Sequence, residues 1–208
     1  YLDRLVLQVV SDQNAELAGL QAGEIDLGSS ELRSEDYVPI RRLEEQGRLQ
    51  LVELGVEPSA DAFWFCLAPE VKQADPRFVF VQRPEFRQAI SHAVDREAFA
   101  ETVFRGAAVP VWGPVTPGNS EWFSPDIPRY TSDDERAREL LRGIGLEDRN
   151  GNGVVETAGG TEARFTVVTE RGVGSYEPGL AVLSAELGRI GIALEIAELE
   201  STEVATRL

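Results

Sequence analysis

Apolar residues recur along this chain at a spacing of two in some segments and at a spacing of three to four in the segments between them. This succession of two spacings constrains the fold more than any other feature of the sequence. A period of two predicts a half-buried strand, whereas apolar residues three and four positions apart predict an amphipathic helix. The predicted strands are 5–10, 25–28 and 49–54, and the helices between them are a short one capped by Asn14 and ended by Gly23 and a longer one at 33–46. Strands and helices in this order are typical of an α/β fold.

The second part of the chain carries the same two patterns with one long interruption. The predicted elements are a buried aromatic strand at 62–67, a loop with a helical turn at 68–83, helices at 84–94 and 96–105, a helix that opens at 132–135 and runs to 144, a strand at 165–169, a helix at 180–190 and a strand at 192–196. The interruption, residues 107–130, is rich in proline and contains Trp112 and Trp122. So long a loop in a compact domain is often functional. Its aromatic side chains can either stack on a ligand or pin the loop to the domain.

The net charge of the chain argues against partners that are bound through their phosphate groups. The chain of 208 residues has 36 acidic and 20 basic side chains, and its formal net charge is −16. Proteins that bind nucleic acids or anionic membranes through phosphate groups carry the opposite charge. The sequence therefore predicts neither partner, and no stretch approaches the roughly 20 apolar residues that span a bilayer. The absence of methionine indicates that Tyr1 is not a natural translation start, so we expect a piece of a longer protein.

Few side chains offer nucleophilic or soft metal-binding chemistry. The chain has one cysteine, Cys66, and one histidine, His92. A single cysteine excludes an internal disulfide, and a single histidine leaves little scope for a His-based metal site. A Cys66–His92 catalytic pair is the enzymatic alternative. We disfavour it because His92 lies off the apolar stripe of its predicted helix.

Residues 148–156 follow the first half of a calcium-binding loop. Asp148, Asn150 and Asn152 alternate along the chain, and Glu156 comes later. Oxygen-bearing side chains at this spacing are typical of EF-hand loops, which also require a bidentate glutamate at the twelfth position. That position is Gly159 here, so the full pattern fails. Two interpretations remain, a turn held by its own side chains and a weak Ca²⁺ site with Asp148, Asn150, Asn152 and Glu156 as ligands.

Five short motifs, in order along the chain, resemble those of the family 5 extracellular solute-binding proteins. They are LQAGEID at 20–26, FRQAISHAVDREA at 86–98, GPVTPG at 113–118, DRNGNG at 148–153 and LGRIGI at 187–192. Each motif is weak alone, whereas the set in the family's order covers nearly the whole chain. The chain is thereby identified as similar to the oligopeptide- and dipeptide-binding components of bacterial ABC importers.

The resemblance implies part of a periplasmic-binding-protein-like (type II) fold, in which two α/β lobes close around a ligand. Residues 1–62 would belong to the first lobe and residues 63–208 to the N-terminal part of the second, with the aromatic strand 62–67 crossing between them. The family's C-terminal ligand-gripping segment would lie beyond Leu208. We therefore expect this chain alone to bind ligand poorly.

The resemblance also implies ligand-binding residues. It places Phe63, Trp64 and Cys66 at the floor of the cleft, where many relatives have asparagine in place of Cys66, and it leaves Trp112 and Trp122 as candidates in the proline-rich loop. Core packing is the alternative role for the same side chains, since free cysteine is among the most buried residue types.

The implied function is binding without catalysis. The protein would capture a peptide or a similar polar solute outside the cytoplasm, in a periplasm or on a lipid-anchored surface, and deliver it to an ABC permease. The alternatives on the same fold are a nickel, haem or sugar ligand, and a sensory or regulatory binding module. No cofactor is expected apart from the Ca²⁺ alternative.

Overall fold

The computed structural model describes residues 2–28, 34–68, 70, 74–171 and 176–207. Contacts divide the chain into two compact units, Tyr1–Leu54 and Gly55–Leu208. This boundary precedes the expected one between 1–62 and 63–208, and the assignment of either part to a lobe stays a prediction. None of the described helices is both long enough and apolar enough to cross a membrane.

The first unit contains the helices α1 (Gln13–Ala22) and α2 (Ser34–Glu45). The N-cap of α1 is Asp12, whose side chain accepts a hydrogen bond from the backbone N–H of Ala15, and the prediction of Asn14 as the cap is wrong. The helix ends as predicted at Gly23, whose φ of 73° is a left-handed conformation that glycine adopts without strain.

The three strands predicted in this unit do not form in the part of it that the structure describes. Residues 5–10, 25–28 and 49–54 pair with no described strand, and most of their apolar side chains face solvent: Leu7 is 86% exposed and Val9 is 97% exposed. Periodicity shows which face a strand would bury, but a strand also needs a neighbour for its backbone N–H and C=O groups.

The second unit begins with helices that the sequence predicted well. They are α4 (Phe78–Val81), α5 (Pro84–Ala93), α6 (Arg96–Phe104) and α7 (Asp134–Gly143). Pro84 occupies the first turn of α5, where its missing N–H costs no hydrogen bond. Asp95 caps α6 by accepting from the N–H of Ala98 at 3.0 Å, and Asp133 caps α7 in the same way.

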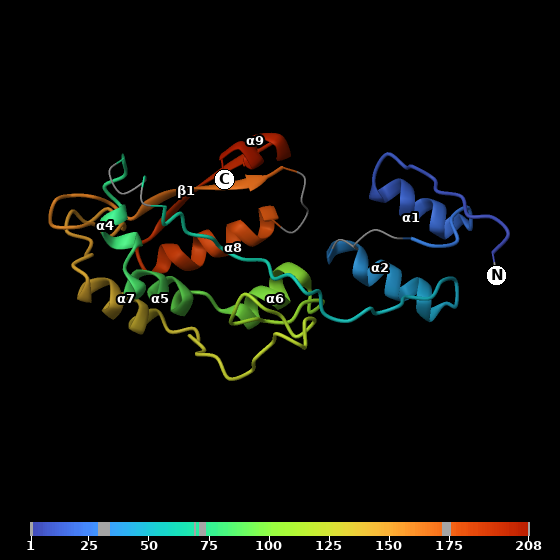
Figure 1. The fold of residues 1–208 in the computed structure, drawn as a ribbon, viewed down its shortest axis with the longest axis horizontal. Helices are drawn as coiled ribbons and strands as arrows, with labels where there is room; N and C mark the ends of the chain where they lie inside the picture. Colours follow the sequence, from blue (N-terminus) through green and yellow to red (C-terminus); the bar gives the residue numbers. More distant parts are fainter. Residues whose placement is uncertain (1, 29–33, 69, 71–73, 172–175, 208) are drawn as a thin grey trace. The chain divides into compact units, whose positions relative to one another are not determined.

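The same unit ends in a strand–helix–strand motif. Its elements are β1 (Arg164–Glu170), α8 (Tyr176–Arg189) and β2 (Ala193–Leu199), followed by α9 (Ser201–Arg207). The strands are parallel, with Arg164 opposite Ala193 and Glu170 opposite Leu199. Helix α8 connects the strands and packs against β2 (Figure 1). The sequence predicted all three elements, which confirms the α/β pattern in this part of the chain.

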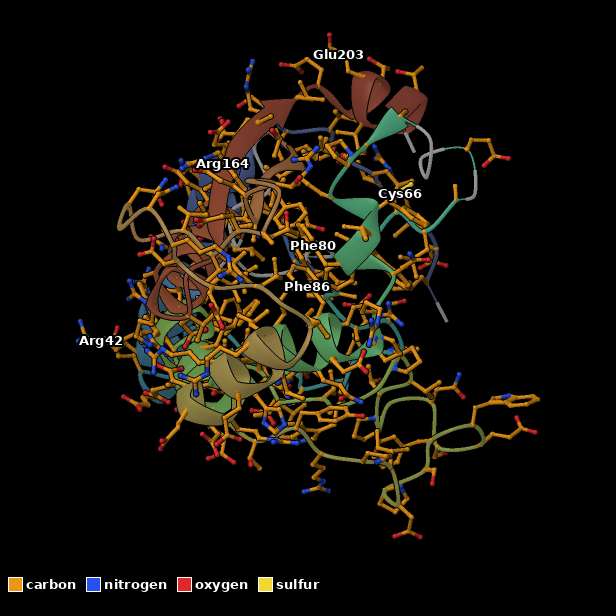
Figure 2. The ribbon with its side chains drawn as sticks, turned by 90° about the vertical axis from the view of Figure 1, so that its left-hand side faces the viewer. Arg42, Cys66, Phe80, Phe86, Arg164 and Glu203 are labelled. Atoms are coloured by element: carbon orange, nitrogen blue, oxygen red, sulfur yellow. The ribbon has the colours of Figure 1, made fainter. Side chains whose placement is uncertain are left out.

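Aromatic side chains form the centre of the core in the second unit. The ring centroids of Phe80 and Phe86 are 5.2 Å apart, and that of Phe165 lies 5.8 Å from Phe86. Figure 2 shows Phe80 and Phe86 next to each other in the interior, with Cys66 further out. The other buried members of this cluster are Val81, Ala89, Ile90, Ala93, Ala137, Leu141, Leu146, Ala163, Leu187, Ile190 and Ile192. The core therefore joins α4, α5, α7, α8 and both strands.

Candidate functional site

Residues 62–67 present an open surface beside this core. The prediction of a buried strand is wrong, because the segment pairs with no described strand and Trp64 is 79% exposed. Phe63 and Phe65 are half-buried, with their rings edge to face at 5.2 Å, and Phe65 packs on Phe86. Cys66 is exposed like Trp64. Burial thus alternates along the segment, with phenylalanines on the packed face and the tryptophan and cysteine on the open one.

The proline-rich loop forms a second candidate surface. A cavity of about 270 Å³ lies between this loop and the start of α6, and its lining includes Trp112, Phe123, Glu97 and Arg129. Trp112 is half-buried, and the Arg96 guanidinium lies 4.7 Å from the centre of its ring, a cation–π contact. Burial lowers the pKa of Arg96 from its ordinary value, although the nearby Glu186 opposes this effect.

The two tryptophans of this loop have different surroundings. Trp122 is 73% exposed and does not line the cavity, whereas Phe123 does. Sequence reasoning missed Glu97 and Arg129 as neighbours, because they lie far apart along the chain and no local pattern links them. The cavity therefore combines an aromatic wall with one acidic and one basic group.

The loop is anchored to the start of the unit. Thr116 is 2% exposed, and its hydroxyl donates to the carbonyl oxygen of Glu57. The Thr116 hydroxyl oxygen also accepts from the N–H of Gly118 at 3.2 Å, and Ser59 pairs with Val115 in an isolated antiparallel bridge. The position of the aromatic wall therefore depends on contacts between residues 56–59 and 115–118.

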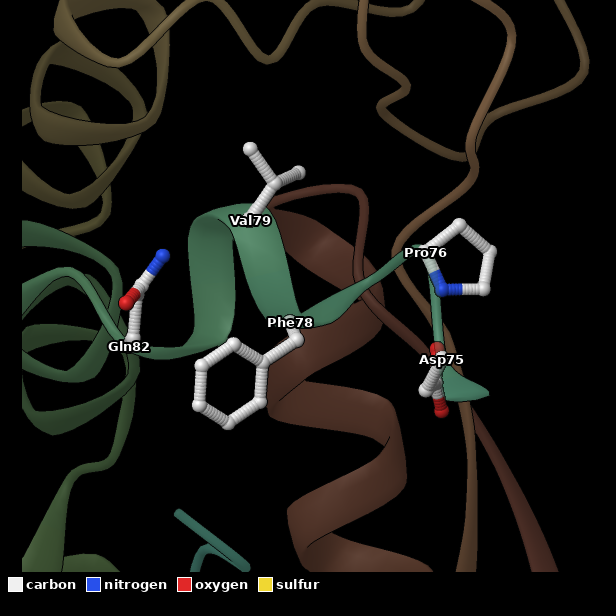
Figure 3. Close-up of a pocket in the computed structure, with 5 residues that line it drawn as sticks. All are labelled: Asp75, Pro76, Phe78, Val79 and Gln82. Atoms are coloured by element: carbon white, nitrogen blue, oxygen red, sulfur yellow. The ribbon is translucent and has the colours of Figure 1, made fainter. Parts of the chain in front are cut away.

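A smaller pocket of about 170 Å³ lies beside α4 (Figure 3). Its one charged lining group is Asp75, and this carboxylate is already paired, with Arg77 at 2.5 Å. Hydrogen bonds from the Arg77 side chain hold the pKa of Asp75 below its usual range. Among the described residues that line it, the pocket therefore presents no unpaired charge with which to orient a polar ligand.

The loop at 148–156 adopts the side-chain-stabilised turn that the sequence offered as one interpretation. The carboxylate of Asp148 accepts hydrogen bonds from the N–H groups of Gly151, Asn152 and Gly153, at 2.8 to 3.1 Å. In the part of the chain that the structure describes, no group of three or more His, Cys, Asp or Glu residues is arranged to hold a metal ion. The predicted calcium ligands include two asparagines, so this observation leaves the calcium interpretation as a prediction.

Glu186 is a buried carboxylate on α8 next to the turn between α5 and α6. It is 6% exposed, and one oxygen accepts from the N–H of Asp95 at 3.3 Å. The other oxygen, Oε2, is buried and has no hydrogen-bond partner among the described residues. Burial raises the pKa of Glu186 above its usual value, against the lowering effects of the Asp95 N–H and of Arg189.

We expect Glu186→Gln to stabilise the protein at neutral pH. Because the folded-state pKa is raised, the folded protein holds a proton at pH values between the unfolded and the folded pKa, where the unfolded chain has already released it. The stability due to that proton is complete below the unfolded pKa and is lost as pH rises through the folded pKa. Glutamine carries no charge at either pH, so the gain at pH 7 should be about 1 kcal/mol.

Urea unfolding at several pH values between about 4 and 7 measures this effect. Glu177→Gln, at an exposed position of the same helix, is the matched control and should change little. A Glu186→Gln variant that is less stable than the wild type at pH 7 would contradict the expectation.

The fold described above is part of the fold of a type II periplasmic binding protein. A solved periplasmic oligopeptide-binding protein from Thermotoga maritima matches 97% of this chain with 37% of its own, at a TM-score of 0.75 and 20% identity. The model of the bacterial extracellular solute-binding proteins, family 5 Middle, matches residues 1–208. The chain belongs to this family.

Two named relatives illustrate the range within the family. The oligopeptide-binding protein AppA of Bacillus subtilis is 25% identical over 94% of this chain and 33% of its own length. Its structure in complex with a nonapeptide covers 95% of this chain and 36% of its own, at a TM-score of 0.70. Heme-binding protein A of Haemophilus influenzae is 30% identical over 69% of this chain and 24% of its own. The chain spans about a third or less of the length of these relatives.

Proposed function

We propose that this chain is the central part of a solute-binding protein that captures an oligopeptide outside the cytoplasm and delivers it to an ABC permease. The observation that carries the proposal is the family match over every residue from 1 to 208. The shared fold with AppA, whose solved complex contains a nonapeptide, supports a peptide as the solute. The protein binds and releases its ligand, and no bond is made or broken.

The open side chains of the second unit suit such a ligand. Trp64 is a large, rigid apolar surface that a ligand side chain can cover, and covering it removes apolar area from water. In the cavity beside the proline-rich loop, Glu97 and Arg129 offer one negative and one positive group. These charges match the ammonium and carboxylate groups that every free peptide carries. Contacts from the rest of the full-length protein complete the proposed pocket.

Mass spectrometry of small molecules that co-purify with the full-length protein tests the ligand class. A peptide that then binds the emptied protein in calorimetric titrations supports the proposal. An oligosaccharide or a metal chelate in place of the peptide would contradict a peptide ligand. The role of a solute-binding protein would still stand. Peptide uptake that requires the protein in cells supports transport, whereas binding without uptake would favour a sensory module.

Haem is the second candidate ligand, because the relative named heme-binding protein A reaches 30% identity. The chain has a single histidine, His92, and its Nδ1 lies 2.8 Å from the carbonyl oxygen of Thr131. The ring of His92 also packs edge-on against Tyr130 at 5.5 Å. Visible absorbance of the purified protein distinguishes haem from a peptide directly.

We expect Trp64→Ala to weaken peptide binding by the full-length protein about tenfold, the loss typical of removing a large aromatic contact. The folded protein should keep its stability, because Trp64 is 79% exposed. Phe65→Leu is the matched control, since Phe65 lies on the packed face of the same segment. That variant should lower the unfolding midpoint and leave the affinity of the folded protein unchanged. Equal peptide affinities of Trp64→Ala and the wild type would show that Trp64 does not contribute to peptide binding.

A further inference from the structure

We propose that the loop 148–156 binds a calcium ion, with Glu156 as the buried carboxylate that completes the site. The sequence left a structural turn and a cation site as alternatives, and the observed turn is compatible with both. What distinguishes them is a buried oxygen that the turn does not use. The proposal is independent of which solute the protein carries.

Glu156 supplies this oxygen. The residue is 3% exposed, and its Oε1 accepts from the backbone N–H of Arg149 at 2.9 Å, which joins this carboxylate to the start of the loop next to Asp148. Its Oε2 is buried and has no hydrogen-bond partner among the described residues. Two backbone hydrogen bonds to Glu147, at 3.0 and 3.1 Å, fix the chain at this position. An unpaired buried carboxylate oxygen is costly, and a bound cation would offset that cost.

The amide oxygens of the loop each accept one backbone hydrogen bond within it. Asn150 Oδ1 accepts from the N–H of Asn152 at 2.9 Å, and Asn152 Oδ1 accepts from the N–H of Val154 at 2.8 Å. The amide nitrogen of Asn152 donates to Glu162 at 2.7 Å, which fixes the oxygen end of that amide. Each amide oxygen keeps a second lone pair for a cation.

The neighbouring arginines pair with other groups. The guanidinium of Arg149 donates to Glu147 at 2.9 Å and to the carbonyl oxygen of Gly145 at 3.2 Å. The guanidinium of Arg164 donates to Glu162 at 3.2 Å. The two arginines therefore pair with the carboxylates of Glu147 and Glu162. Neither of them neutralises Glu156 Oε2, which can bind a metal cation.

Oxygen-only ligands indicate a hard cation, and calcium accepts an irregular set of oxygen ligands, whereas magnesium demands near-ideal octahedral geometry. The proposed ligands are the carboxylates of Asp148 and Glu156 and the amide oxygens of Asn150 and Asn152. Only two of these groups are charged, and Gly159 replaces the usual bidentate glutamate. We therefore expect a dissociation constant of about 0.1 to 1 mM, the range of extracellular calcium modules.

Calorimetric titration of the protein with CaCl₂ and with MgCl₂ tests the proposal. We expect saturable calcium binding and at least tenfold weaker magnesium binding. About 10 mM CaCl₂ should raise the unfolding midpoint by roughly 3–10 °C. No saturable heat with calcium, or equal binding of the two metals, would overturn the site.

Three variants localise the binding. Glu156→Gln keeps the acceptor for the Arg149 N–H and removes the buried charge, so it should weaken calcium binding at least tenfold. Asn150→Ala alters an exposed ligand without disturbing the core, and it decides the question if the first variant fails to fold. Glu147→Gln removes an adjacent exposed charge and should change the affinity less than about twofold. Equal losses in Glu147→Gln and Glu156→Gln would indicate diffuse attraction to an acidic surface and would overturn the proposal.

Discussion

Replacing Phe86 with alanine is expected to destabilise the unit Gly55–Leu208 by about 3–5 kcal/mol, the usual cost of deleting a buried phenylalanine ring. The Phe86 side chain is 0% exposed. Its ring contacts those of Phe65, Phe80 and Phe165, at centroid distances of 6.4, 5.2 and 5.8 Å. Deleting the ring would therefore leave a cavity where α4, α5, β1 and the segment 62–67 now pack together. Such a loss is a large share of the stability of a typical domain.

Denaturant unfolding followed by tryptophan fluorescence measures this loss, because all three tryptophans of the chain lie in the same unit. Phe86→Leu should cost less, since it keeps most of the apolar volume. Trp122→Ala is the surface control and should change the free energy of unfolding by less than about 0.5 kcal/mol. A Phe86→Ala variant within about 1 kcal/mol of the wild type would show that this aromatic cluster is not the centre of the core.

Replacing Gly118 with alanine is expected to detach the proline-rich loop from residues 56–59. A Cβ atom at this position would lie 1.9 Å from the carbonyl oxygen of Val56 and 2.9 Å from the carbonyl carbon of Glu57. Both atoms belong to the backbone, so the two segments would have to move apart. The hydrogen bond from Thr116 to Glu57 and the Ser59–Val115 bridge should then break. Overpacking of this kind typically costs about 1–3 kcal/mol.

Hydrogen exchange resolves the effect along the chain. Amides at 115–119 should exchange at least tenfold faster in Gly118→Ala, whereas amides in α5, α7 and α8 should keep their protection. Gly188→Ala is the matched control, because it lies in α8 and, apart from the adjoining backbone of the helix itself, no described heavy atom lies within 4 Å of the position that the new methyl group would take. That substitution should be neutral or stabilising by up to about 1 kcal/mol. Unchanged exchange at 115–119 would mean that the loop does not depend on this close approach.

The sequence indicated one aromatic side chain of the cavity but not the other groups that line it. Aromatic side chains beside proline indicated Trp112, and the structure places it in a cavity. Nothing local indicated that Glu97 and Arg129 would lie beside it, or that Trp122 would not. The burial of Glu156 was not predictable either. The sequence motif alone does not show whether this carboxylate is buried by the rest of the unit or exposed to water.

The sequence by itself predicted the helices α4 to α8 of the second unit, the two strands on either side of α8 and the resemblance of the chain to its family, but neither α9 nor the parallel pairing of the strands. Helix spacing and caps such as Asp95 act within a few residues, so the chain encodes them locally. The strands predicted at 165–169 and 192–196 form because each has the other as its partner, whereas the segments 5–10, 25–28 and 49–54 have no partner strand among the described residues. Only the tertiary structure decided which apolar segments become strands and which side chains meet in a site. Strand pairing and side-chain convergence depend on neighbours that are distant in the sequence, and periodicity carries no information about them.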